Sequence, residues 1–368
     1  MKTAIERVTK PFSGIHLVNV SRLGQQITVP QNTLLHAGPP YESLESVPEP
    51  VKIAACQILI LDGLSQTLDQ ARELIDSGQF RFSPAQDHNV VTPLAQVVSA
   101  SSWVVQASDG RNTGYGALVE GPAPALRFGS GDPACLDAMR ALDGVASLLQ
   151  AELSRQPIDL RPIIEAGLLN GDECHAVTQA THSQLLRSLP ALEDCLAGKP
   201  WFVLPIVMAA CSVALKRHGL LRAVGGNGVT FGWKPAGRSQ WKTTAAVAPA
   251  GQRFIAQSES TALPAIGDSA VVDFAGLGAQ ALEYSPEMQE VWATHLPGTT
   301  PAPRCEIIDQ TTGLVCPKRI SETGQSPAVH LAMVHSHDSG KILGRGAYIP
   351  PVNLFESAPE AMNQELAR

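Results

Sequence analysis

WFVLPIVMAACSVAL, residues 201–215, is the longest uncharged apolar run in the chain, and it lies between Lys199 and Lys216. We expect it to be too short to span a bilayer, and the run is typical of a buried helix over 201–218. The sequence changes in character on either side of this helix. Those changes predict the domain organisation.

The segment before the apolar run predicts a small group of helices. Asp132-Pro133 combines a capping residue with proline at the first helical position, and apolar residues follow at helical spacing. A second helix is expected from Asp159 to Gly171, and a third over 173–189, where Pro190 stops it.

Short β-branched runs bounded by Gly, Asp or Asn predict strands on both sides of the helical segment. The expected strands are 15–20, 102–106, 115–119 and 124–128 before it, and 229–233, 270–274, 305–308 and 331–334 after it. A helix capped by Ser65 and ended by Gly78 is expected among the first group. We therefore predict an α+β fold with two mixed α/β lobes, 1–130 and 200–368, and a small all-helical domain, 131–199, inserted between them.

Composition excludes several classes of protein. The chain has 368 residues, of which 44% are hydrophobic and 17% charged, so it is expected to fold rather than to be disordered. Its 27 Lys and Arg against 34 Asp and Glu give a net charge of −7, which argues against a nucleic-acid or membrane partner. The seven cysteines lack metal or disulfide spacing, and the N-terminus lacks an apolar signal, so we expect a cytoplasmic protein.

The densest candidate for acid–base chemistry is Gly171-Asp-Glu-Cys-His175. A carboxylate beside an imidazole can orient the ring and tune its pKa, which suits Asp172, Glu173 and His175 to proton transfer. The alternative is that Asp172 and Glu173 only cap the next helix.

Arg111-Asn112, Glu120 and Arg127 surround the strands expected at 115–119 and 124–128. Two arginines separated by short strands could converge on one carboxylate or phosphate, because a guanidinium binds either in a bidentate manner. The alternative is that these are charges at hairpin ends that face water.

Two glycine-containing turns add further polar candidates. Gly225-Gly-Asn-Gly228 with Thr230 is either an anion-binding turn or a tight hairpin that uses Asn227-Gly228, and no P-loop pattern follows it. Asp268 either binds a substrate amide or ties its own turn.

Several histidines are also candidates. His36 and His88 lie on turns where exposed binding residues are often found. His335 and His337 could share a metal if they alternate on a strand, but there is no third His or Cys nearby. We therefore expect no metal and no cofactor, with His335 as one functional histidine in a loop.

Taken in order, several segments resemble one family. They are Leu34 to Pro40, Asn112 to Gly129, Asn170 to His175, Val207 to Ala210, Asn227 to Gly232, Ile266 to Ser269, and Val334 to Ser336 with Gly344-Arg-Gly346. Over about residues 33–360 this series is similar to the YlbE-like family, which includes the AllG subunit of oxamate carbamoyltransferase. The chain departs from the family pattern at Gln86-Asp-His88, Ala176-Val177 and Gly198-Lys-Pro200, so it looks like a divergent member.

The resemblance implies transfer of a carbamoyl group between carbamoyl phosphate and a small amide or ureide acid such as oxamate. It implies a homo-oligomer or an assembly with companion subunits, and it suggests that the candidate residues above line one cleft. Two alternatives are a non-catalytic structural or ligand-binding subunit and a ureide or amide hydrolase. The low charged fraction suits a chain that buries much of its surface in an assembly.

Overall fold

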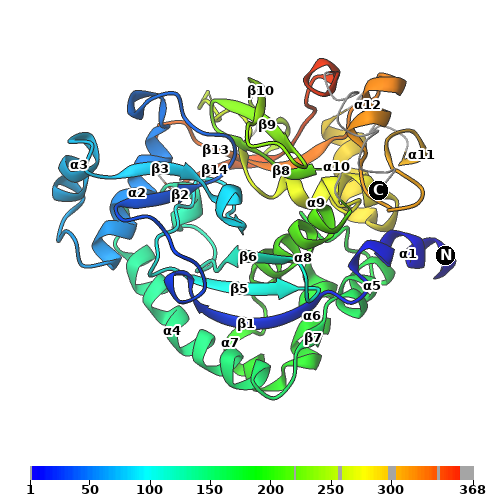
Figure 1. Ribbon diagram of the computed structural model, residues 1–368, viewed down its shortest axis with the longest axis horizontal. Helices are drawn as coiled ribbons and strands as arrows, with labels where there is room; N and C mark the ends of the chain where they lie inside the picture. The colour runs from blue at the N-terminus through cyan, green and yellow to red at the C-terminus, as the bar shows by residue number, and fades with distance from the viewer. Residues whose placement is uncertain (1, 219–220, 256–258, 297–303, 338–339, 357–368) are drawn as a thin grey trace.

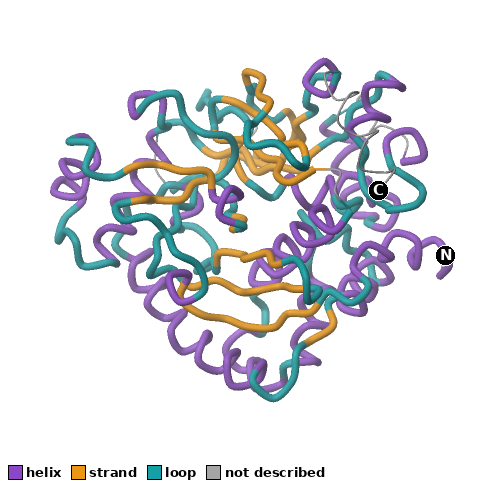
Figure 2. Tube along the Cα trace, in the orientation of Figure 1, coloured by secondary structure: helices purple, strands orange, loops and turns teal. Residues whose placement is uncertain are grey.

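A computed structural model describes residues 2–218, 221–255, 259–296, 304–337 and 340–356. It contains helices together with several small, mainly antiparallel sheets, which confirms the α+β class. Figure 2 shows the strands in two groups, with helical segments along the outside of the lower group.

The lower group is a five-stranded sheet (Figure 1). Its order is β4 (Val90–Val91), β6 (Thr113–Ala117), β5 (Trp103–Ser108), β1 (His16–Arg22) and β7 (Ile158–Asp159). The β4–β6 pair is parallel and the other pairs are antiparallel. Helix α4 (Ala134–Leu153) packs on β1, and helix α8 (Leu204–Arg217) packs on β5 and β6.

The close approach of α8 to β6 depends on two glycines. A Cβ on Gly116 would lie 2.1 Å from the carbonyl oxygen of Pro205, and one on Gly114 would lie 2.7 Å from that of Ala209. Neither position has room for a larger residue, so α8 lies directly against the sheet backbone.

The upper group contains three smaller sheets. The first has the order β10 (Lys242–Ala245), β9 (Thr230–Pro235), β8 (Leu221–Asn227) and β12 (Ile266–Gly267). The second has the order β11 (Ala250–Arg253), β14 (Ile342–Tyr348) and β13 (Val329–Val334), and the third is the parallel pair β2 (Thr33–His36) and β3 (Arg81–Pro84). Helix α9 (Ala270–Phe274) contacts α8, β8 and β13, so α8 joins the two groups through the core.

The remaining helices lie around these layers (Figure 1). They are α1 (Lys2–Thr9), α2 (Glu49–Leu61), α3 (Leu68–Asp76), α5 (Arg161–Leu169), α6 (Gln179–Ser188), α7 (Glu193–Leu196), α10 (Pro286–His295), α11 (Arg304–Ile307) and α12 (Pro317–Thr323). The expected strands at 15–20, 102–106, 115–119, 229–233 and 331–334 are confirmed within a few residues. The boundaries of the predicted lobes and helical domain stay a prediction, and β7, from the middle segment, pairs with β1.

The buried helix is confirmed, but the argument from its length was wrong. Residues 200–217 are long and apolar enough for a membrane span, yet 72% of them are buried inside the protein. Burial against the sheets therefore identifies α8 as a core helix. Five of the seven cysteines are buried as expected, whereas Cys195 is partly exposed and Cys305 is exposed.

Several local predictions were wrong. The segments 270–274 and 305–308 are largely helical instead of extended, and Leu126–Phe128 is a 3-10 turn. The helix that was expected to be capped by Ser65 is α3, and its N-cap is Thr67. The Thr67 hydroxyl accepts a hydrogen bond from the amide of Gln70.

The glycine-rich stretch at 225–228 is divided between a strand and a turn. Gly225 and Gly226 lie inside β8, where a Cβ on Gly226 would meet the carbonyl oxygen of Ala265 at 2.1 Å. Of these glycines, only Gly228 belongs to the hairpin turn. Its φ of +85° is a left-handed conformation, which favours glycine at this position.

Candidate functional site

The loop between α5 and α6 replaces the first part of the helix expected over 173–189, since α6 begins only at Gln179. Cys174 adopts φ +66°, which is uncommon for a residue with a side chain and interrupts helical geometry. Its neighbours Glu173 and His175 are both buried and belong to one polar cluster.

Glu173 is held as an anion by the loop that carries it. Its carboxylate accepts the backbone N–H groups of His175 at 3.0 Å and Val177 at 2.7 Å, and also that of Ala176. Burial alone would raise the pKa of Glu173, but His330, His175 and the Val177 amide outweigh it and hold the pKa below its ordinary value. Glu173 therefore supplies a fixed negative charge.

His175 forms a dyad with Asp273 of α9. His175 Nδ1 lies 2.9 Å from Asp273 Oδ2, while Asp273 Oδ1 accepts the amide of Ala279 at 2.9 Å. Burial would lower the pKa of His175, but the charges of Asp273 and Glu173 raise it above its ordinary value. Its Nε2 makes no hydrogen bond within the part of the chain that the structure describes, so this nitrogen is available for proton transfer.

His330 of β13 completes the cluster. His175, Asp273 and His330 place ligand-type atoms within 4.8 Å of one another, a spacing that a metal ion also requires. However, the indole N–H of Trp292 donates to His330 Nε2 at 2.8 Å, so neutral His330 must carry its proton on Nδ1, which lies 3.5 Å from Glu173 Oε2. His330 then has no lone pair left for a metal, and the geometry favours a proton network.

The dyad lies at a cavity of about 310 Å³, which we call the His175 cavity. Its polar lining includes Arg127, His175, Ser269, His330 and Arg345, and its apolar lining includes Leu94, Leu204, Phe254 and Met288. This combination of apolar walls and a few polar groups is typical of a small-molecule site.

Arg127 brings an incompletely bonded positive charge to the His175 cavity. Its Nη1 lies 3.9 Å from Glu120 Oε2, and both atoms are buried without a hydrogen-bond partner. Burial lowers the pKa of Arg127 to about 10 against the opposing charge of Glu120, so the guanidinium stays protonated at neutral pH. The guanidinium can therefore bind an anionic group of a ligand.

Asp268 is next to the cavity residue Ser269 but is itself fully buried. Its carboxylate accepts the amides of Gly38 at 2.9 Å and Thr92 at 3.1 Å and the side chain of Gln86 at 2.6 Å. Burial raises its pKa to about 7. Through these hydrogen bonds Asp268 connects its own segment to the segments that contain Gly38, Gln86 and Thr92, and it does not line the cavity.

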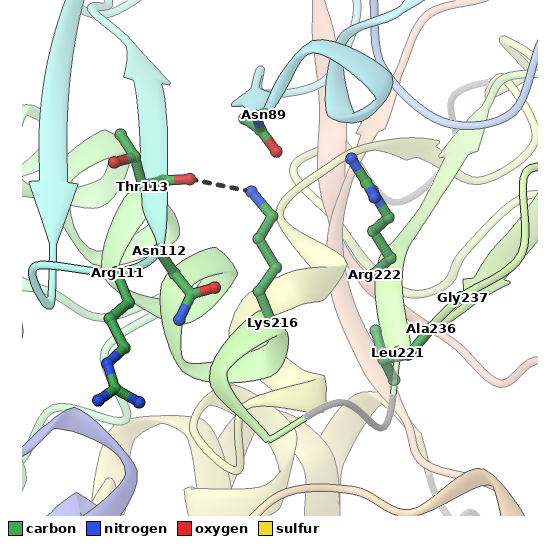
Figure 3. Close-up of a pocket in the computed structure, with 9 residues that line it drawn as sticks. All are labelled: Asn89, Arg111, Asn112, Thr113, Lys216, Leu221, Arg222, Ala236 and Gly237. Atoms are coloured by element: carbon green, nitrogen blue, oxygen red, sulfur yellow. Dashed lines mark hydrogen bonds between the residues drawn. The ribbon is translucent and has the colours of Figure 1, made fainter. Parts of the chain in front are cut away.

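The structure separates the two arginines whose convergence on one anion was one of two alternatives. Arg127 lines the His175 cavity, whereas Arg111 and Asn112 line a second pocket with Lys216 and Arg222 (Figure 3). The alternative of one anion site built from both arginines is therefore excluded for these two pockets.

Most other predicted residues have structural roles. Asp172 accepts the amide and hydroxyl of Thr181, and Asn227 accepts the amides of Val229 and Thr230 in the hairpin turn. Of the two readings of that turn, the tight hairpin is the one that the contacts support.

Three predicted histidines do not line the His175 cavity. His36 is buried, and burial lowers its pKa to about 4, so it is neutral. His88 Nε2 shares a hydrogen bond with Ser83, and His335 Nδ1 accepts the amide of His337.

Asp273, His330, Lys216 and Arg222 were missed. A usable signal existed for the first two, because each is an ionisable residue inside an apolar run, AVVDF at 270–274 and VHLAMV at 329–334. Such residues are rarely buried unless they are paired.

Comparisons with known proteins identify relatives of this chain. The profile of the family described as "Oxamate carbamoyltransferase subunit AllG" matches residues 80–269. The AllG subunit of Escherichia coli strain K12 is 27% identical over 91% of this chain and 90% of its own length, and the uncharacterized protein YahG of the same strain is 27% identical over 89% and 78%. A conserved protein of unknown function from Enterococcus faecalis V583 shares the fold, with a TM-score of 0.83 and 24% identity over 100% of this chain and 98% of that one.

Proposed function

The chain belongs to the AllG family, and from this premise we propose that it is a subunit of a carbamoyltransferase assembly in which the His175 cavity holds the reacting group. The transfer would move a carbamoyl group between carbamoyl phosphate and a small amide or ureide acid of the oxamate type. The observation that carries the proposal is the Asp273–His175 dyad, whose unbonded Nε2 belongs to a residue lining a cavity that also contains Arg127.

The raised pKa of His175 suits this residue to donate a proton in the reaction. When a phosphate oxygen attacks the carbamoyl carbon of a carbamoylated acid, a C–O bond forms, the C–N bond breaks, and the leaving amide nitrogen needs a proton. An imidazolium held by Asp273 can donate that proton from Nε2. In the reverse direction the neutral ring takes the proton from the attacking amide nitrogen.

Arg127 supports the binding of an acid in the same cavity. Its buried Nη1 has an unused donor, and a carboxylate or phosphate oxygen placed there would supply the missing hydrogen bond. Glu120, whose Oε2 is 3.9 Å away, keeps the guanidinium oriented.

The surface near the cavity supports an assembly. Phe254 lines the cavity and is 59% exposed, and its neighbour Ile255 is 72% exposed. A contiguous exposed apolar patch is typical of a surface that another protein covers, and these two neighbours would contribute to one. A companion subunit bound there would close the cavity to water.

The experiment is to measure carbamoyl phosphate formation from carbamoylated acids and phosphate, using the chain purified with its companion subunits. We expect His175→Gln to lower the rate by about 10² to 10⁴-fold, the usual contribution of general acid–base catalysis. His16→Gln, on β1 of the lower sheet, is the matched control and should keep the wild-type rate. Equal rates for the two variants would refute the role of His175, and an inactive wild-type assembly would favour a non-catalytic subunit.

A further inference from the structure

A second pocket, of about 330 Å³, lies between the lower sheet and the β8–β9 hairpin, and we call it the Lys216 pocket (Figure 3). Its walls come from the β5–β6 turn and the start of β6, the end of α8, the start of β8 and the residues after β9. Asn89, just before β4, completes it. It has no lining residue in common with the His175 cavity.

The charge of the Lys216 pocket is unbalanced. Among the residues that the structure describes, its lining includes Arg111, Lys216 and Arg222 and no carboxylate. Lys216 Nζ donates to the carbonyl oxygen of Thr113 at 3.2 Å, and Arg222 makes no ion pair with any residue in the described ranges. The nearby carboxylate of Asp109 is already engaged by Arg217 Nε at 2.6 Å and by Asn112.

The side chains of the Lys216 pocket point toward a common space. In Figure 3 the Lys216 ammonium and the Arg222 guanidinium both extend toward Asn89, whereas Arg111 points away. Asn89 adopts φ +63° at the end of the 3-10 turn before β4, a left-handed conformation that Asn tolerates better than most residues. Two cations and one amide therefore surround the same volume.

This arrangement is costly without an anion. Burial, together with the positive charge of Arg222, lowers the pKa of Lys216 to about 7. An anion between the two cations would replace repulsion with attraction and would restore the charge on Lys216.

We propose that the Lys216 pocket binds the phosphate group of a small molecule. A phosphate has enough acceptor oxygens to take several hydrogen bonds from an ammonium and a guanidinium at once, whereas a carboxylate has only two oxygens. The pocket also leaves space beside the phosphate for a small organic group. This inference does not depend on the reaction proposed for the His175 cavity.

The test is calorimetric titration of the full chain with inorganic phosphate. We expect Lys216→Met and Arg222→Met each to weaken binding at least about tenfold, the size of one charge-assisted hydrogen bond. Arg187→Met, on α6 and outside both pockets, is the matched control and should bind as the wild type does. His175→Gln should also keep this binding, which separates the result from the proposed function.

A second readout identifies Lys216 directly. Titration at pH 8 in two buffers of different ionisation enthalpy should show proton uptake on binding, since the anion raises the pKa of Lys216, and Lys216→Met should abolish the uptake. The proposal is overturned if the wild type binds no phosphate, or if Lys216→Met binds phosphate as tightly as the wild type. It is equally overturned if only His175→Gln loses the binding.

Discussion

The His175 cavity and the Lys216 pocket both contain charged side chains, but they balance those charges differently. In the cavity each basic side chain has a carboxylate nearby: Asp273 for His175, Glu173 for His330, Glu120 for Arg127 and Glu287 for Arg345. In the pocket Lys216 and Arg222 lie near each other, and the described lining residues include no carboxylate. A balanced cluster can hold and move a proton, whereas an unbalanced pair of cations is suited to binding an anion.

The largest expected difference between the two sites is in stability. Arg127→Met leaves Glu120 buried without its counter-charge, which should lower the free energy of unfolding by about 3–5 kcal/mol. Arg222 is exposed, and Arg222→Met removes only its repulsion with Lys216. This substitution should change the free energy of unfolding by less than about 0.5 kcal/mol. Urea denaturation of both variants checks this contrast, and equal losses would contradict the charge balance described here.

A second expected effect concerns Asp273 as a positioning residue. Asp273→Asn keeps the side-chain shape but removes the charge that raises the pKa of His175. We expect turnover to fall by about 10²-fold and the pH profile of kcat to shift toward lower pH. Steady-state kinetics across pH on the assembly measures both, and a lower rate with an unshifted profile would indicate a purely structural role.

A smaller effect should appear as a pH dependence in the Lys216 pocket. Burial lowers the pKa of Lys216 to about 7 in the folded protein, so between pH 7 and about 10 the unfolded chain binds more protons. The contribution of Lys216 should therefore make the protein more stable as pH rises through this range, by roughly 1–2 kcal/mol.

Urea denaturation at pH 7 and pH 9.5 measures this difference, and Lys216→Met should be less pH-dependent by that amount. Lys199→Met, a lysine outside both pockets, is the control and should keep the wild-type difference. An unchanged difference in Lys216→Met would show that its ammonium is not destabilised by burial.

Local patterns predicted the elements whose surroundings match their sequence. The uncharged run at 201–215 became a buried helix, and β1, β5, β9 and β13 formed where β-branched runs predicted them. AVVDF at 270–274 looks like a strand but forms α9, because its position is decided by packing on α8 and β13. The loop at 170–178 could not be predicted either, since the conformation of Cys174 depends on the amides that Glu173 accepts.

The candidate site was predicted only in part for a similar reason. Glu173 and His175 are neighbours in sequence, so one motif identified both. Their partners Asp273 and His330 lie about a hundred or more residues further along the chain. Arg111 and Arg127 are close in sequence, but the five-stranded sheet places them at different pockets. Spatial convergence depends on tertiary structure, which spacing along a chain does not determine.

The measurement that tests the central claim most directly is the pKa of His175, from an NMR titration of the imidazole ring with His175→Gln used to assign its signal. The dyad predicts a pKa above the ordinary value of about 6.5 in the wild type and a clear decrease in Asp273→Asn. A wild-type pKa at or below 6.5, or one that Asp273→Asn leaves unchanged, would contradict the claim that the His175 cavity is built to hold and donate a proton.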